Sequence, residues 1–184
     1  MADLTPYEKA VLDTIAYAEG TLGVSNNGYD VIVTFKLING WTNDTKIVHG
    51  ETDWYQKEAN SDAAGRYQFL GSSWKSLFDK KNPPMTKVNQ DTAAIKLVNK
   101  KLLATNIDSR AVSISQLDSK DKFDIFLQKC ASTWASLPLT TNITIDGQLK
   151  KAGNGWYSGQ GGKKTSKELY DIFILALTKY KANT

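Results

Sequence analysis

The 184-residue sequence contains a single cysteine, Cys130, and a single histidine, His49, and this scarcity excludes several kinds of site. One cysteine cannot form an intrachain disulfide, and one Cys with one His cannot supply the ligands of a structural zinc site. A Ser-His-Asp or Cys-His mechanism would have to use His49. Carboxylate chemistry is therefore the natural enzymatic option, and we expect neither a metal nor a cofactor.

Long apolar runs are also lacking. No segment reaches the roughly 18 apolar residues of a membrane span, so we expect no membrane insertion. The N-terminus has no basic region followed by an apolar run, so we expect cytoplasmic synthesis without a signal peptide. Hydrophobic residues make up 41% and charged residues 23%, which is ordinary for a soluble protein, and the length predicts one domain.

The charge is unevenly distributed along the chain. Residues 1–92 hold 9 basic and 12 acidic side chains, net −3, whereas residues 93–184 hold 14 and 7, net +7. A basic half favours approach to an anionic surface such as nucleic acid, lipid headgroups or a bacterial wall, although a solvated helical face with spare lysines gives the same pattern. The half lacks the interleaved aromatics of a nucleic-acid reader, so we expect no nucleic-acid partner.

The pattern of apolar residues and caps predicts an α+β fold that is mainly helical. In the first helix, over 6–19, Thr5 is the N-cap, Pro6 the first helical residue and Glu8 the third. Further helices are predicted over 73–81, 89–103, 114–118, 121–136 and 166–181. A strand is predicted over 30–38, a short strand or a strand-to-helix entry over 65–70, and a loop over 139–162.

Glu19 is the most informative side chain. It follows Ile15 by four residues, so it falls on the apolar face of its helix, and it lies at the helix C-terminus, where the macrodipole is negative. Both effects disfavour a carboxylate and favour the protonated form that a general acid needs. A surface glutamate or a buried hydrogen-bonding residue fits the same pattern.

Other residues suit binding or a second acidic role. Asp30 is the first choice for a second carboxylate in glycoside hydrolysis, although a turn-stabilising aspartate has the same position. Strand alternation would place Arg66 and Gln68 on one face, where the amide could hold a sugar hydroxyl or satisfy a sheet edge. The loop with Tyr157 and Gln160 combines aromatic and polar groups, as saccharide stacking requires. Cys130 lies on an apolar stripe, which is typical of a buried thiol.

Five blocks in this order resemble the phage lambda endolysin family of lysozyme-like lytic transglycosylases. The resemblance covers roughly residues 7–180, and the blocks read Glu19-Gly20-Thr21, Gly28-Tyr29-Asp30-Val31-Ile32-Val33, Gly65-Arg66-Tyr67-Gln68-Phe69-Leu70, Asn89-Gln90-Asp91 and Cys130-Ala-Ser-Thr-Trp134-Ala135-Ser136-Leu137-Pro138. The resemblance implies one lysozyme-like domain over 1–184, with a small β-containing lobe at about 28–70. Segments 6–20 and 73–181 would form a helical lobe across a cleft, with 139–162 as an extended loop.

The resemblance also implies an activity and its residues. The family cleaves the β-1,4 bond between N-acetylmuramic acid and N-acetylglucosamine and forms a 1,6-anhydro product. Glu19 would be the catalytic acid and base. Gln68 would line the cleft, Tyr29 and Asp30 would lie beside it, and Tyr157 and Gln160 would face it. The enzyme would act as a monomer on peptidoglycan glycan strands, after release through a holin-like pore into the periplasm or carriage in the virion.

Two departures from the family pattern concern the substrate site. Residues 139–156 separate Ser-Leu-Pro from the Tyr157-to-Gln160 segment, and Thr34-Phe35 replaces the small glycines usual after the strand. Three alternatives remain open at this point: a hydrolytic lysozyme that uses Glu19 and Asp30, a non-catalytic wall-binding or virion protein, and a Cys-His peptidase.

The basic C-terminal half generates a first prediction. If its positive charge helps the protein to dock on anionic walls, sedimentation with purified walls should decrease steadily as salt is raised, because added ions screen exposed charges. Wall binding that does not change between low and high salt would contradict a role for this charge.

Overall fold

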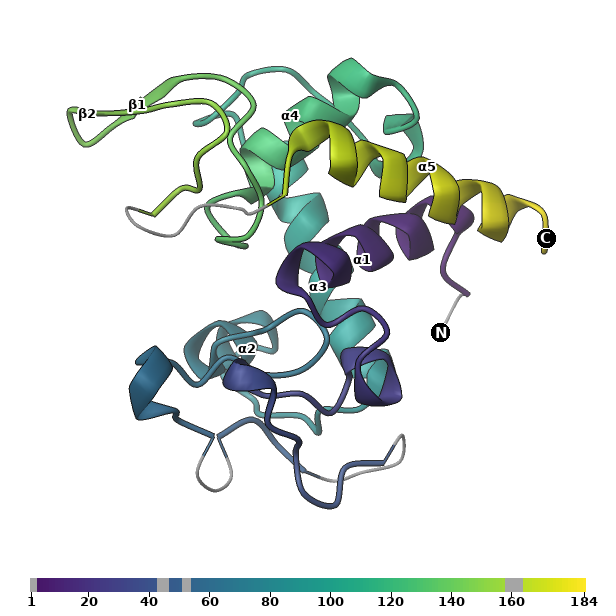
Figure 1. The fold of residues 1–184 in the computed structure, drawn as a ribbon, viewed down its shortest axis with the longest axis vertical. Coiled ribbons are helices and arrows are strands. Elements are labelled where there is room, and N and C mark those ends of the chain that lie inside the picture. Colours follow the sequence, from purple (N-terminus) through teal and green to yellow (C-terminus); the bar gives the residue numbers. More distant parts are fainter. Residues whose placement is uncertain (1–2, 43–46, 51–53, 158–163) are drawn as a thin grey trace. The chain divides into compact units, whose positions relative to one another are not determined.

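The computed structural model describes residues 3–42, 47–50, 54–157 and 164–184 (Figure 1). The fold is mixed α+β and mainly helical, and within these ranges the sheet is one antiparallel pair. The elements are α1 (Pro6–Glu19), α2 (Gly71–Leu77), α3 (Lys87–Leu103), α4 (Lys120–Cys130), β1 (Ile143–Ile145), β2 (Gln148–Lys150) and α5 (Ser166–Lys181). Two compact units contain residues 1–18 with 98–184, and residues 19–97. No helix in the described ranges is long and apolar enough to cross a bilayer.

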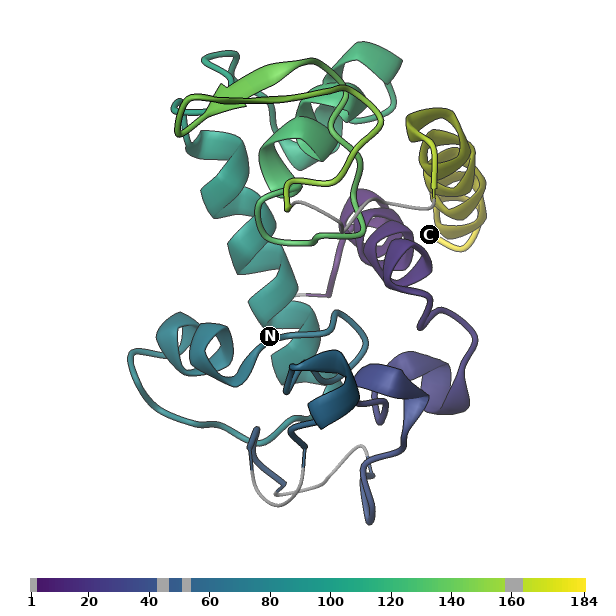
Figure 2. The same cartoon turned by 60° about the vertical axis from the view of Figure 1, so that its left-hand side comes forward.

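In the first unit, α1 and α5 lie side by side and antiparallel, as both Figure 1 and Figure 2 show. At one end the Tyr17 hydroxyl donates to Glu168 at 2.6 Å, and at the other the Tyr180 hydroxyl donates to Asp13 at 2.7 Å. The predicted N-cap of α1 is confirmed, because the Glu8 amide donates to the Thr5 hydroxyl at 3.2 Å. The bounds of α1 and α5 match the predicted helices.

The core of this unit is built on α4. The ring of Phe123 lies 5.4 Å from that of Phe126 and 5.2 Å from that of Phe173 on α5. The helix predicted over 121–136 ends earlier, at Cys130. Its last turn tightens there, since the amides of both Thr133 and Trp134 donate to the Cys130 carbonyl.

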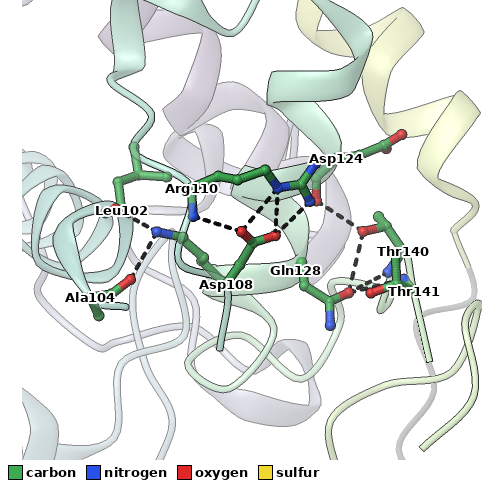
Figure 3. Close-up of polar contacts among 9 residues, drawn as sticks. Leu102, Ala104, Asp108, Arg110, Asp124, Gln128, Thr140 and Thr141 are labelled. Atoms are coloured by element: carbon green, nitrogen blue, oxygen red, sulfur yellow. Dashed lines mark hydrogen bonds and ion pairs between the residues drawn. The ribbon is translucent and has the colours of Figure 1, made fainter. Parts of the chain in front are cut away.

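The segment predicted as a loop over 139–162 contains the hairpin of β1 and β2, paired with Ile143 opposite Lys150. Asp146 and Gly147 form its turn with φ of 50° and 75°, the left-handed pair that suits the twist of a two-residue hairpin. The start of the segment is fixed to α4, because the Gln128 side-chain oxygen accepts from the amides of Thr140 and Thr141 at 2.8 and 3.1 Å (Figure 3).

In the second unit, the strand predicted over 30–38 is a tight turn rather than a strand. Val31 and Leu37 form an isolated bridge, and Thr34 and Phe35 between them have φ of 69° and 60°. The backbone therefore reverses in the middle of the β-branched run, and the Ile32 amide donates to the Lys36 carbonyl at 2.8 Å. The predicted β-containing segment 28–70 contributes only isolated bridges in its described parts.

A buried lysine caps the C-terminal end of α3 in the first unit. Lys129 is almost fully buried on α4, and its ammonium donates to the carbonyls of Leu102 and Ala104, both at 2.8 Å. Figure 3 shows these two carbonyls converging on one donor. The last carbonyls of a helix have no partner within the helix, and a cation there also complements the negative end of the dipole.

Replacement of this ammonium should be costly. We expect Lys129→Met to lower the free energy of unfolding by about 2 kcal/mol, because one buried and one partly buried carbonyl lose their donor. Lys100→Met is the matched control, since Lys100 is exposed near the same end of α3. Urea denaturation measures both variants, and equal stabilities would show that the Lys129 cap contributes nothing.

Candidate functional site

Glu19 is the last residue of α1 and is partly buried. Gly20 follows with φ of 76°, a left-handed conformation that ends the helix. Thr21 is fully buried, and its hydroxyl donates to the Arg66 carbonyl at 2.6 Å. The chain directly after Glu19 is thus tied to the turn that contains Gln68.

The segment 65–70 is a tight turn, which corrects the predicted extended conformation. Gly65 and Gln68 both have positive φ, 77° and 48°, and Ala64 pairs with Phe69 across the turn. Alternation therefore does not apply here: Arg66 is buried, whereas Gln68 is partly buried. The Gln68 amide nitrogen donates to the Gly65 carbonyl at 2.9 Å, so this side chain stabilises its own turn.

Gln90 on α3 holds this turn in place. It is fully buried, and its side-chain oxygen accepts from the Arg66 amide at 2.9 Å. Its side-chain nitrogen donates to the carbonyls of Tyr29 and Met85 at 3.0 and 2.8 Å. Gly65 has to be glycine, because a Cβ there would lie 2.3 Å from the Gln90 oxygen.

Asp91 forms a second buried contact next to Gln90. One oxygen of its carboxylate accepts from the hydroxyls of Tyr29 and Tyr67, at 2.8 and 2.6 Å. The Arg66 guanidinium lies 5.2 Å from the centre of the Tyr29 ring, so it also stabilises this cluster. Burial raises the pKa of Asp91, which outweighs the opposing effect of the two hydroxyls, and burial also raises the pKa of both tyrosines.

The roles of Gln90 and Asp91 were not identified from the sequence, although both belong to a block of the family resemblance. The available signal is their position in α3. Only Thr92 separates these two polar residues from Ala93 and Ala94, which are both buried. Polar residues next to buried positions of a helix need buried partners.

Tyr29 and Asp30 both point into the second unit. Tyr29 is 6% exposed, and Asp30 is 5% exposed. One oxygen of the Asp30 carboxylate accepts from the Ser25 hydroxyl at 2.9 Å and from the Asn26 side-chain amide at 2.5 Å. Because Asn26 has φ of 44°, the carboxylate holds a turn in a conformation that non-glycine residues rarely adopt.

The remaining predicted binding residues belong to the first unit. Tyr157 is 49% exposed, as predicted, and its hydroxyl donates to the Ser132 carbonyl at 3.0 Å. This bond orients the phenol ring and leaves part of its surface accessible. Gln160 lies outside the described residues.

Cys130 and His49 have surroundings that disfavour nucleophilic catalysis. Cys130 is fully buried, and burial raises the pKa of its thiol, so the reactive thiolate is suppressed. His49 is buried against Trp54, its Nε2 lies 2.7 Å from the Phe69 carbonyl oxygen, and burial lowers its pKa. Within the described ranges, no three His, Cys, Asp or Glu side chains gather in a way that could hold a metal ion.

The buried carboxylate of Asp91 makes stability depend on pH. Because its folded pKa is raised, the folded state holds the proton more tightly than the unfolded chain, and stability should fall as pH rises from about 4 through the folded pKa. Asp91→Asn keeps an oxygen acceptor for both tyrosines and removes the charge. We therefore expect the stability of the wild type relative to this variant to fall as pH rises. Thermal unfolding of both proteins across pH measures it, and a constant difference would refute the assignment.

The chain is similar to proteins of known family and structure. The family model described as Endolysin matches residues 9–164. The structure of bacteriophage lambda lysozyme complexed with a chitohexasaccharide has a similar fold, with a TM-score of 0.61, 24% identity, and coverage of 96% of this chain and 97% of that chain. A second structure of lysozyme from bacteriophage lambda gives a TM-score of 0.53, 23% identity, and coverage of 98% and 97%. No curated protein matches the sequence significantly.

The family match spans most of the chain and includes α1 with Glu19 and the turn with Gln68. The fold agrees with it, because the similar structures cover almost the whole chain. The chain therefore belongs to the Endolysin family, whose members degrade the bacterial cell wall.

Proposed function

We propose that the protein is a peptidoglycan lytic transglycosylase that cleaves the β-1,4 bond between N-acetylmuramic acid and N-acetylglucosamine, with Glu19 as the catalytic acid and base. The position of Glu19 carries this proposal. It ends α1 at a glycine, it is partly buried, and the next residues are tied to the turn of Gln68. A carboxyl held on a fixed backbone is what general acid catalysis requires.

Glu19 would act twice in this reaction. As an acid it donates its proton to the glycosidic oxygen while the bond from that oxygen to C1 of the muramyl residue breaks. As a base it then accepts the proton of the muramyl 6-hydroxyl, whose oxygen forms the new bond to C1. The product is the 1,6-anhydro sugar, no water is consumed, and Glu19 returns to its protonated form. The substrate's N-acetyl group would help to stabilise the cationic centre.

The environment of Asp30 favours this route over hydrolysis. A hydrolytic pair needs a second carboxylate that can reach water or the sugar. Asp30 is buried, one of its oxygens accepts from Ser25 and Asn26, and the other is also shielded from solvent. It therefore suits the support of the turn better than the activation of water. We assign the same supporting role to Tyr29, and glycan contact to Gln68, Tyr157 and Gln160.

Glu19→Gln should reduce the release of fragments from purified sacculi by about 100-fold or more, because the amide can neither donate nor accept the required proton. Glu58→Gln is the matched control, since Glu58 is an exposed glutamate of the same unit. We expect it to act as the wild type does. A Glu19→Gln enzyme with full activity would overturn the catalytic assignment.

Mass spectrometry of the released fragments identifies the reaction. Anhydro-muramyl ends, lighter than reducing ends by one water, are the expected product, and Asp30→Asn should leave this product type unchanged. Reducing ends would instead establish a hydrolytic lysozyme. A wild type that sediments with walls and releases nothing would establish a wall-binding protein.

A further inference from the structure

An unusual turn lies beside the candidate acid in the second unit. Thr34 and Phe35 are consecutive non-glycine residues with φ of 69° and 60°. Left-handed conformations are costly for L-residues, and most of all for a β-branched residue such as threonine. The turn persists because its flanks are fixed: the Ile32 amide donates to the Lys36 carbonyl at 2.8 Å, and the Val33 amide to the Ala63 carbonyl at 2.7 Å.

The strained backbone presents an aromatic ring to solvent. Phe35 is 59% exposed, so the turn gains little apolar burial from this residue. Leu37, two residues further, is exposed as well. Burial of Phe35 therefore offsets little of the backbone strain in this turn. The residue is better explained by binding of a ligand than by a contribution to stability.

The ring of Phe35 lies next to the end of α1. A Cβ built on Gly20 would lie 3.4 Å from the tip of the ring, so the ring lies close to this exposed glycine. Gly20 directly follows Glu19. The strained turn therefore places a solvent-exposed aromatic surface in contact with the residue adjacent to the candidate acid.

The chemistry of the ring indicates what it can bind. A pyranose ring has an apolar face of C–H groups, and its hydroxyls project around the rim. A phenyl ring offers a flat apolar surface with a negative face, which suits those C–H groups and makes no demand for hydrogen bonds. If the protein has the proposed function, the ligand bound next to Glu19 is a glycan strand made of such sugars.

We propose that Phe35 is a glycan-binding residue that stacks on a pyranose ring of the strand close to the bond that Glu19 cleaves. The proposal rests on the proposed function, and it adds a specificity-determining contact. Two observations carry it: the exposure of a large aromatic side chain at a strained position, and the contact of that side chain with Gly20.

Two glycine variants separate the ring from the backbone. Phe35→Gly and Thr34→Gly both place glycine at a positive-φ position of the same turn, and only the first removes the ring. Both should melt at or above the temperature of the parent, because glycine adopts this conformation without strain. In a Glu19→Gln background, titration calorimetry with chitohexaose should show about tenfold weaker binding for Phe35→Gly and unchanged binding for Thr34→Gly.

Further variants test the role of the flat ring. Phe35→Tyr should bind chitohexaose as the parent does, whereas Phe35→Leu should bind as weakly as Phe35→Gly, since leucine is apolar and not planar. On sacculi, with Glu19 intact, Phe35→Gly should raise KM more than it lowers kcat, because the ring binds and does not react.

Several outcomes would overturn the proposal. These are unchanged chitohexaose affinity in Phe35→Gly, equal losses in Phe35→Gly and Thr34→Gly, or parent-like affinity in Phe35→Leu. Each leaves the proposed function intact as long as Glu19→Gln abolishes the release of fragments. Conversely, an active Glu19→Gln enzyme would refute the proposed function and would leave the affinity comparison, which needs no turnover, fully interpretable.

Discussion

The buried amide of Gln90 joins three separate segments of the second unit. Its two ends bind the amide of Arg66 and the carbonyls of Tyr29 and Met85, so one side chain satisfies three backbone groups that no regular sheet pairs. The described part of this unit has only isolated bridges, so it cannot rely on ladders of backbone hydrogen bonds. The side-chain amide takes over that role, and the turn that contains Gln68 depends on it.

The neighbouring Asp91 acts on the same segments through side chains. Tyr29 and Tyr67 come from two different turns and meet on one carboxylate oxygen. Burial of this carboxylate costs desolvation free energy, and in return the two tyrosines are held in a specific geometry. Gln90 and Asp91 are consecutive on α3, so one helical turn positions both the backbone and the aromatic side chains behind the candidate site.

The sequence predicted best those parts of the fold whose signals are local. The N-cap Thr5 and the apolar periods of α1 and α5 are local, and these two helices have the predicted bounds. The strand predicted over 30–38 failed because β-propensity does not report the reversal at Thr34 and Phe35. The hairpin of β1 and β2 was missed although the pair Asp146-Gly147 is a recognised turn signal. Glu19 could be proposed as the candidate acid from its place on α1, whereas the role of Gln90 depends on partners such as Tyr29 and Arg66, which are far from it in the sequence.

The contact between Gly65 and Gln90 limits how this unit can evolve. A side chain at residue 65 has no room while the amide of Gln90 is present, since the two would lie 2.3 Å apart. A smaller residue at position 90 would remove that clash, but the Met85 methyl would still lie 2.9 Å from the added Cβ, and the Arg66 amide and two carbonyls would lose their partner. Neither residue can therefore be replaced alone without a loss of stability. Exposed positions such as Phe35 and the hairpin can be substituted without disturbing that pair.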